Sequence, residues 1–310
     1  MPTPVIIDCD PGHDDVFAIW LAAAHPSVDL RAITTVGGNG LLEYTTLNAR
    51  IACTVAGIEG VPIAAGAADP IAGHLRPADW IHGDNALGGP VLPEPTVPLD
   101  DRDAQQLLRD TLASSDEPVT IIATGPLTNI GILVRDQPEL RDRIARVIWM
   151  GGSTARGNVT PYAEFNAWTD PESIKLVLDS GVDFTMVGLN ITHQALISAD
   201  VRRRIAAIGT RSAQFGAELL EFFCATYLVA EKMPEGPLHD PVCVALLVDP
   251  DVATTVSTRI DVELDGTETR GATSCDLIDI LGRPHNATVA MDLDADRFWS
   301  LIEDAVRTLA

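Results

Sequence analysis

Near its beginning the chain reads Val5-Ile6-Ile7-Asp8-Cys9-Asp10-Pro11-Gly12-His13-Asp14-Asp15, and the prediction of the fold starts from this stretch. The apolar, β-branched run before Asp8 predicts a buried strand, and Pro11-Gly12 predicts a sharp turn after it. The apolar segment 16–22 is typical of a helix packed back onto that strand. A strand, a turn and a helix in this order predict the first unit of an open α/β sheet, in which ligands bind beyond the carboxyl ends of the strands.

Four carboxylates fall within eight positions of this turn. Asp14 and Asp15 lie in the first turn of the predicted helix, where acidic residues commonly complement the helix dipole. The helix dipole does not explain Asp8 and Asp10, because these two residues lie at the end of the strand. Clustered carboxylates repel one another unless a cation lies among them, so the cluster predicts a catalytic site or a site for a hard divalent metal ion.

Strand-like and helix-like segments alternate along the rest of the chain. Strands are predicted at 28–36, 61–65, 119–123, 146–150, 184–188, 256–262 and 288–291, and helices at 41–56, 101–112, from 127, 171–178, 199–248 with a break near 234–237, and 297–309. This alternation predicts a mainly parallel sheet flanked by helices. No repeat and no Pro- or Ser-rich linker marks a boundary, so one domain is expected over residues 1–310. Residues 66–100 and 151–170 break the pattern and predict long functional loops.

Composition limits the classes of function. The chain has 310 residues, 46% of them hydrophobic, which is enough for a large buried core. Its 44 acidic and 21 basic residues give a net charge of −23. Such a surface repels nucleic-acid phosphates and anionic membranes, so neither is expected as a partner. No apolar run reaches the roughly 18 residues that a membrane span needs.

The five cysteines form no CxxC pair or other metal-binding spacing. Residues 1–4 show neither the basic region nor the apolar core of a targeting segment. We therefore expect reduced thiols and a cytoplasmic protein. Cys9 lies inside the first predicted strand, where core packing is its expected role.

Polar residues recur where predicted strands end. They are Asp10, Asn39, Thr124, Met150 with Gly151-Gly152, and Asn190. Because the carboxyl ends of parallel strands share one edge of a sheet, these residues are expected to converge on one crevice. Asn39 alone is equally well explained as a turn residue after two glycines.

The segment 157–166 alternates amides and a carboxylate around an aromatic residue. The oxygens of Asn158, Glu164 and Asn166 accept hydrogen bonds, so together they are suited to gripping adjacent hydroxyls of a diol. As an isolated loop the segment is a weak signal.

Two histidines stand out in other segments. Asp240 precedes a proline at the start of an apolar helix, which is also the position of an ordinary N-cap, and His239 lies beside it. His82 lies in a loop that contains Gly83 and Asp84. A structural role explains either histidine as readily as a catalytic one, and no functional role is expected for His13, His25, His74, His193 or His285.

Several common catalytic motifs are missing. The chain contains no GxxxxGK[ST] phosphate loop, no HExxH and no GxSxG. The glycine-rich segment 36–40 lacks the GxGxxG spacing of dinucleotide-binding proteins.

Taken together, these segments resemble the nucleoside hydrolases, the inosine-uridine preferring ribohydrolase family, over nearly the whole chain. Residues 8–15 are similar to the family's DxDPGxDD signature. Further similar segments, in family order, are 35–39, His82-Gly83 with Gly88, 123–129, 150–152, Asn158 with 164–166, and 239–241. The resemblance implies an open, mainly parallel sheet flanked by helices with a Rossmann-like core, and hydrolysis of ribonucleosides to free base and ribose in nucleoside salvage.

The resemblance also implies a calcium ion, held by Asp10, Asp15, Asp240 and the backbone carbonyl of Thr124. Oxygen ligands with several carboxylates suit Ca²⁺. Asp10 is implied to be the general base that takes a proton from the attacking water. The ribose is implied to contact Asp14, Asn39, Met150, Asn158, Glu164 and Asn166.

On the side of the base, the resemblance makes His239 the candidate acid for the leaving group and His82 a second contact. Phe165 and Tyr227 are expected to stack against or bracket the base. The two histidines are typical of pyrimidine-preferring and broad members, and broad inosine-uridine specificity is expected here. The family also implies a homodimer or homotetramer.

Two other functions fit part of the sequence. A phosphatase with a DxD nucleophile would use Asp8 and Asp10, but Pro-Gly-His follows where that class has a small residue and threonine. A nucleoside-binding or sensor protein would keep the pocket without turnover. Loss of Asp10 or His239 would have indicated such a protein, and both residues are present.

Overall fold

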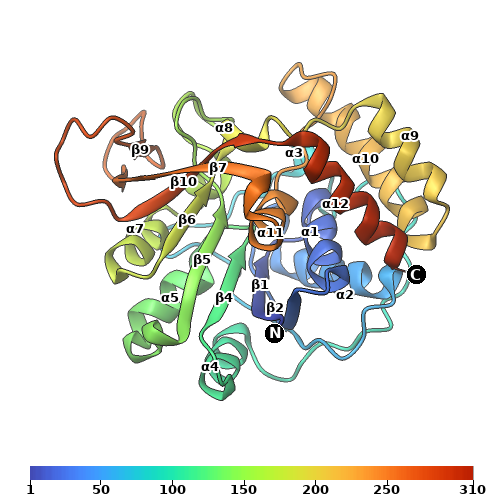
Figure 1. Cartoon of the computed structure of the whole chain (residues 1–310), viewed down its shortest axis with the longest axis horizontal. Helices are drawn as coiled ribbons and strands as arrows, with labels where there is room; N and C mark the ends of the chain where they lie inside the picture. Colours follow the sequence, from blue (N-terminus) through green and yellow to red (C-terminus); the bar gives the residue numbers. More distant parts are fainter. Residues whose placement is uncertain (310) are drawn as a thin grey trace.

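The computed structural model describes residues 1–309, and its main feature is a sheet of eight strands in the order β3-β2-β1-β4-β5-β6-β10-β7 (Figure 1). Every neighbouring pair is parallel except β10 and β7, which are antiparallel. The expected open, mainly parallel α/β fold is thus confirmed. The strands are β1 (Thr3–Cys9), β2 (Val28–Thr35), β3 (Ile63–Ala65), β4 (Val119–Ala123), β5 (Ile144–Met150), β6 (Phe184–Val187), β7 (Ala253–Thr258) and β10 (Ala287–Leu293).

Helices cover both faces of the sheet (Figure 1). One face carries α1 (His13–Ala24), α2 (Leu42–Ala56), α9 (Ala199–Ile208), α10 (Arg211–Ala230), α11 (Pro241–Val248) and α12 (Ala295–Thr308). The other carries α4 (Ala104–Ser114), α5 (Thr128–Asp136) and α7 (Pro171–Ser180). Because successive side chains of a strand alternate between faces, Val5, Ile7 and Cys9 of β1 pack into the first core and Ile6 into the second.

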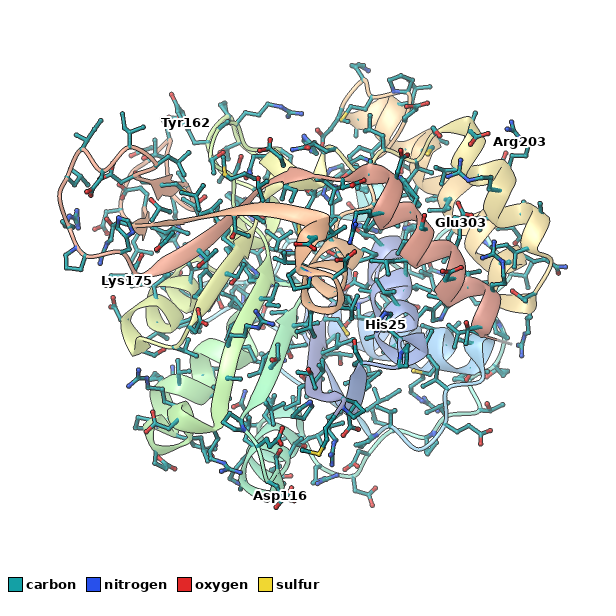
Figure 2. The ribbon with its side chains drawn as sticks, viewed as in Figure 1. His25, Asp116, Tyr162, Lys175, Arg203 and Glu303 are labelled. Carbon is teal, nitrogen blue, oxygen red and sulfur yellow. The ribbon has the colours of Figure 1, made fainter. Side chains whose placement is uncertain are left out.

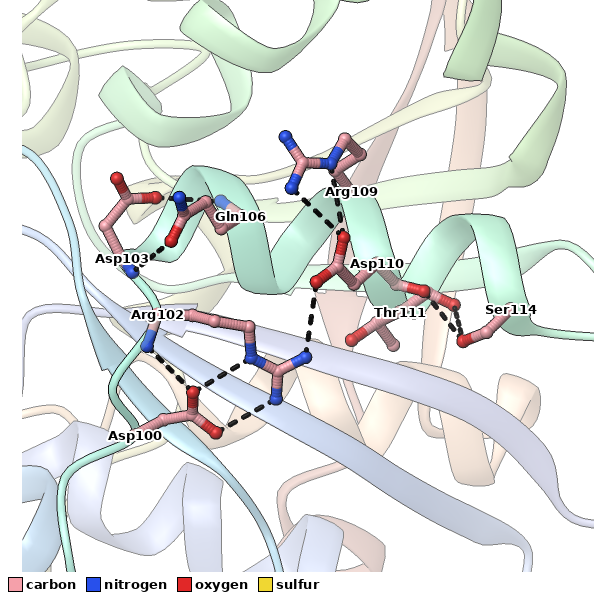
Figure 3. A network of polar contacts seen from close by, with 8 residues as sticks. All are labelled: Asp100, Arg102, Asp103, Gln106, Arg109, Asp110, Thr111 and Ser114. Atoms are coloured by element: carbon pink, nitrogen blue, oxygen red, sulfur yellow. Dashed lines mark hydrogen bonds and ion pairs between the residues drawn. The ribbon is translucent and has the colours of Figure 1, made fainter.

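The sequence sets the beginning of α4 through its side chains (Figure 3). Asp103 accepts a hydrogen bond from the backbone of Gln106, and the Gln106 side chain accepts one from the backbone of Asp103. This capping box satisfies two backbone N–H groups that the first helical turn leaves free. Arg102 bonds Asp100 and reaches Asp110 in the second turn of α4, which fastens the incoming loop to the helix.

The prediction of one strand over 256–262 was wrong. The chain leaves the sheet after Thr258, and β8 (Ile260–Val262) instead pairs with β9 (Thr273–Cys275) in a separate hairpin. The side chain of Asn286 bonds both the N–H and the carbonyl of Ile260, which fixes the point of departure. The short β9, Thr273-Ser274-Cys275, has no apolar alternation that would have predicted it.

The two expected loops contain short helices. Residues 66–100 include α3 (Asp79–His82), and residues 151–170 include α6 (Phe165–Thr169). A further short helix, α8 (Leu189–Thr192), follows β6, and 3-10 turns lie at Pro138–Arg143 and Pro250–Val252.

Charged and polar side chains project from the surface. Tyr162, Lys175 and Arg203, on the loop after β5, on α7 and on α9, point away from the body of the molecule (Figure 2). Among residues 1–309, no helix combines the length and the apolar character that crossing a bilayer requires. The five cysteines are free thiols, and all except Cys275 are buried.

Candidate active site

A pocket opens beyond the carboxyl ends of β1, β2, β4 and β5. It is lined by nearly all the residues that the sequence predicts for the site: Asp14, Asn39, His82, Thr124, Met150, Asn158, Glu164, Phe165, Asn166, Tyr227, His239 and Asp240. Asp10 and Asp15, the remaining two, are completely buried and lie next to this lining. The backbone N–H of Asn39 donates to Asp10 Oδ2 at 2.7 Å, and the hydroxyl of Thr124 donates to Asp15 Oδ1 at 2.7 Å.

Ordinary helix capping explains only one of the acidic residues. Asp15 accepts a hydrogen bond from the backbone of Gly12 at 2.9 Å, as a cap of α1 does. Asp240 occupies the N-cap position of α11, but its side chain makes no capping bond. Asp14 Oδ1 is buried without a hydrogen-bond partner among the described residues. Asp14 and Asp240 line the pocket, and helix capping does not account for their carboxylates.

These carboxylates lie close enough together to share a cation. Asp14, Asp15 and Asp240 each offer an oxygen, and the three oxygens lie within 4.8 Å of one another. Burial, followed by the charge of Asp15, raises the pKa of Asp14 to about 8 and that of Asp10 well above its usual value. Burial and the charge of Asp14 likewise raise the pKa of Asp240.

The donor set fits a hard divalent cation. All the candidate ligand atoms are oxygens, and Asp10 Oδ1 as well as Asp14 Oδ1 lacks a partner in residues 1–309. Buried charges of one sign persist when an opposite charge lies among them. Asp10 is not one of the three carboxylates that lie within 4.8 Å of one another. It is connected to them through its backbone N–H, which donates to Asp15 Oδ1 at 3.3 Å.

Two glycines leave room for the Asp10 carboxylate. A Cβ atom on Gly38 would lie 1.9 Å from Asp10 Oδ2, and one on Gly125 would lie 2.6 Å from Asp10 Oδ1. Both distances are far shorter than any real contact, so only glycine permits this position of Asp10. Gly38 and Gly125 thus shape the site without contributing a side chain, whereas their neighbours Asn39 and Thr124 line the pocket.

We expect Gly125→Ala to lower kcat by about 100-fold, because the added methyl displaces Asp10 by a fraction of an ångström to an ångström. Overpacking of this kind also costs about 1–3 kcal/mol of unfolding free energy. Gly60→Ala is the control for kcat, since a Cβ there meets no atom within 4 Å; its φ of 77° strains alanine, so this variant should lose stability without losing kcat. Steady-state kinetics and thermal unfolding of both variants test this prediction. An unchanged kcat in Gly125→Ala would show that catalysis does not depend on the room that Gly125 leaves for Asp10.

The loop 151–166 forms the wall of the pocket next to β5. Glu164 caps α6, accepting hydrogen bonds from the backbone N–H groups of Gly152, Asn166 and Ala167. Burial raises its pKa to about 7. Asn158 Oδ1 accepts from the backbone of Phe165 at 3.0 Å. Glu164 and Asn158 therefore hold the backbone at the start of α6, in addition to the contact with a diol that the sequence predicts for them.

Asn166 connects this wall to the neighbouring strand ends. Its amide donates to the carbonyls of Thr124 and Met150 at 2.9 and 3.1 Å. Its Oδ1 is buried with no partner among residues 1–309, so an acceptor is left for a ligand. The Thr124 carbonyl keeps a second lone pair, because a carbonyl oxygen accepts two hydrogen bonds.

The opposite side of the pocket contains a chain of polar contacts around His239. Its Nε2 lies 2.7 Å from the hydroxyl of Tyr227, and its Nδ1 lies 2.7 Å from Thr192 Oγ1. Burial, followed by the nearby His193, holds the pKa of His239 well below its usual value. The Tyr227 hydroxyl therefore bonds His239 directly, a contact that the expectation of aromatic stacking alone did not include.

The family described as inosine-uridine preferring nucleoside hydrolase matches residues 5–300. The chain belongs to this family. It is therefore a hydrolase that acts on N-glycosyl compounds, as its sequence predicts. A curated relative from Escherichia coli (strain SMS-3-5 / SECEC), named pyrimidine-specific ribonucleoside hydrolase RihA, is 42% identical over 312 residues, with all of both chains covered.

Solved structures of nucleoside hydrolases share the fold. A purine-preferring ribonucleoside hydrolase from Gardnerella vaginalis superposes with a TM-score of 0.91 at 29% identity, covering 98% of each chain. The plant nucleoside hydrolase PpNRh1 superposes with a TM-score of 0.91 at 30% identity, covering 99% of each chain.

Sequence reasoning missed two residues that support the site of this nucleoside hydrolase. Thr192, which bonds His239, comes from α8 and belongs to no motif. His13 is completely buried, and its Nδ1 lies 3.1 Å from Nδ1 of His82. The position of His13 between the aspartates of the 8–15 signature is the sequence feature that could have indicated its place next to the site.

The expectation that every strand-end polar residue converges on the crevice was wrong for Asn190. In this nucleoside hydrolase α8 begins directly after β6 and carries Asn190 away from the pocket lining. The Asn190 amide donates instead to the carbonyl of Ala290 on β10 at 2.8 Å.

Proposed function

We propose that this enzyme hydrolyses the N-glycosidic bond of ribonucleosides with calcium as its resident metal, in nucleoside salvage, and that it prefers pyrimidine ribonucleosides. The observation that carries the proposal is the meeting of the buried carboxylates, the unpartnered Asn166 oxygen and the His239–Tyr227 pair in one pocket. The curated relative at 42% identity, named pyrimidine-specific, supports the choice of base. The broad inosine-uridine specificity expected from the sequence is the second candidate.

Asp10, Asp15, Asp240 and the Thr124 carbonyl would hold the calcium ion, and the unpartnered Asp14 Oδ1 is suited to a ribose hydroxyl or to the ion. When bound, calcium supplies positive charge that keeps the carboxylates ionised and makes water a better acid.

Asp10 would act as the general base. Its Oδ2 is held by the Asn39 N–H, while its Oδ1 has no partner among the described residues and is free to take a proton from the attacking water. Burial raises the proton affinity of this carboxylate, which makes it a stronger base than an exposed aspartate.

The pocket is suited to a ribose that develops positive charge. Cleavage of a glycosidic bond passes through an oxocarbenium-like transition state. Asp14, Glu164 and the Oδ1 of Asn166 place negative charge and an oxygen dipole around the ribose site, which would stabilise that charge. Hydrogen bonds from the ribose hydroxyls to Asn39 and Asn158 would fix the sugar's orientation.

The protonated form of His239 would supply the proton to the leaving base through the Tyr227 hydroxyl, which lies 2.7 Å from its Nε2, and would be left as a neutral imidazole. Because burial holds the pKa of His239 well below its usual value, this imidazolium is a minor species at neutral pH and a strong acid. Phe165 lines the same pocket and its ring packs edge-on to Trp80, with ring centroids 6.2 Å apart, so this aromatic pair would form one apolar surface against which the base packs.

We expect His239→Ala to lower kcat by roughly 10²–10⁴-fold with little change in KM, as for loss of a general acid. The control is a riboside with p-nitrophenol as leaving group, which departs without a proton and should be hydrolysed almost normally by the variant. An equal loss on both substrates, or an effect on KM alone, would contradict the role of His239 as acid.

Release of ribose from uridine, cytidine, inosine, adenosine and guanosine tests the proposed function. Hydrolysis of uridine and cytidine well above the purine ribonucleosides is expected. Comparable rates on inosine and uridine would favour the broad specificity. Tight binding without ribose release would indicate a nucleoside-binding protein, and release of phosphate from nucleotides without cleavage of the glycosidic bond would indicate a phosphatase.

We further propose a single catalytic domain over residues 1–310 that assembles into a homodimer or homotetramer in the cytoplasm. The reduced cysteines and the acidic surface support an intracellular protein without nucleic-acid or membrane partners. Light scattering coupled to size-exclusion chromatography would measure the assembly.

A further inference from the structure

His13 is a buried histidine that is not part of the pocket lining and contacts two residues that are, His82 and Phe223. Its Nδ1 lies 3.1 Å from Nδ1 of His82, and its Nε2 lies 2.8 Å from the carbonyl oxygen of Gly88. The His13 ring is stacked against Phe222 and Phe223, with ring centroids 5.2 and 5.1 Å apart. Each ring nitrogen of His13 thus has one partner in a fixed direction.

The partner of Nε2 determines where the hydrogens lie. A carbonyl oxygen only accepts hydrogen bonds, so the Nε2 of His13 carries a hydrogen. A second hydrogen on Nδ1 would put a positive charge on a completely buried ring, and within residues 1–309 neither ring nitrogen has a carboxylate as its partner. The neutral ring therefore offers a lone pair at Nδ1, and the hydrogen between the two Nδ1 atoms belongs to His82.

The surroundings hold His82 in this place. A Cβ atom on Gly12 would lie 2.4 Å from Nδ1 of His82, so the ring packs directly on the backbone of the signature turn. The backbone N–H of His13 also points at this nitrogen, at 3.5 Å. That distance lies beyond the range of a normal N–H hydrogen bond. The 3.1 Å contact between the two Nδ1 atoms is therefore the one that determines which nitrogen of His82 carries the hydrogen.

We propose that His13 is a positioning residue that holds His82 as the tautomer protonated at Nδ1, so that the Nε2 of His82 meets the substrate as a hydrogen-bond acceptor. His82 lines the pocket, and its Nε2 makes no hydrogen bond to any described residue. As part of the proposed function, His82 then binds a donor of the ribonucleoside, either an N–H or amino group of the base or a hydroxyl of the ribose. It has no proton to give to the leaving base, which leaves that step to His239 and Tyr227.

The direct test is ¹⁵N magic-angle-spinning NMR of the calcium-loaded, histidine-labelled enzyme. The His82 signals are assigned by their absence in His82→Gln. We expect a protonated-type shift at Nδ1 and an unprotonated-type shift at Nε2. A protonated Nε2, with or without a proton on Nδ1, would overturn the proposal. This measurement needs no turnover, so it decides the tautomer even if no ribonucleoside in the panel is hydrolysed and the proposed function fails.

Kinetics of His13 variants give the second test. His13→Phe keeps the aromatic stack and removes the acceptor for His82, and we expect kcat/KM to fall about 3- to 10-fold, mainly through KM, as for loss of the bond to His82. The bond from Nε2 to the Gly88 carbonyl is lost in both His13→Phe and His13→Asn, so the difference between the two variants reports the contact with His82. His13→Asn places an amide oxygen near the position of Nδ1 and should recover part of this loss. His74→Asn, on an exposed loop, is the control with unchanged kinetics. An unchanged KM in His13→Phe, or no recovery in His13→Asn, would show that His13 serves packing alone.

Discussion

Asp10→Asn is expected to lower kcat by about 10⁴-fold or more while the protein keeps its fold. A general base alone contributes roughly 10²–10⁴-fold, and this carboxylate is also a proposed calcium ligand. The amide has the shape of the carboxylate, so it still accepts a hydrogen bond from the Asn39 N–H and fits between Gly38 and Gly125. Discontinuous assays with long incubation times and high enzyme concentration would measure the residual rate.

The fold of this variant should be at least as stable as that of the wild type when both are free of metal. The substitution removes one charge from a buried group of carboxylates whose pKa values are raised by burial and by one another. Asp142→Asn, the same change at an exposed site, is the matched control and should alter neither rate nor melting temperature. A rate within tenfold of the wild type in Asp10→Asn would remove Asp10 from its role as base.

Most of the architecture was predictable because its signals are local. The apolar run 5–7 with its Pro-Gly turn determined the first strand, and the alternation of such runs with helical segments determined a parallel sheet, as the structure confirms. The geometry of parallel strands then predicted that Asn39, Thr124 and Met150 would line one pocket, as they do. Asp240 was placed at the same pocket by the resemblance to the nucleoside hydrolases.

The parts that were missed depend on contacts between distant segments. β8 pairs with β9 while Asn286, 26 positions away, bonds the backbone of Ile260 at the point where the chain leaves the sheet, and nothing within the segment 256–262 indicates the interruption. The partner of His13 lies 69 positions away, and that of His239 lies 47 positions away on a helix of four residues. Such pairs carry no periodicity, so the chemistry of a single histidine cannot be deduced from its neighbours in sequence.

Removal of calcium is expected to abolish ribose release, and added calcium should restore it. Without a cation, the buried carboxylates of Asp10, Asp14 and Asp240 take up protons, as their raised pKa values indicate, and a protonated Asp10 no longer accepts a proton from water. The activity of enzyme dialysed against a chelator, then against chelator-free buffer, would be measured before and after calcium is returned. Full activity in the dialysed enzyme would contradict a catalytic metal.

Calcium should also stabilise the fold. A ligand that binds only the native state adds about 2.7 kcal/mol to the free energy of unfolding at a concentration 100 times its Kd. Asp240→Asn removes one proposed ligand and should shift the calcium dependence of the melting temperature to higher concentration, while Asp142→Asn should leave it unchanged. Magnesium should substitute poorly, because it demands a compact octahedral shell, whereas these oxygens come from three separate segments of the chain. A melting temperature that is insensitive to calcium in the wild type would show that the carboxylates keep their protons and hold no metal.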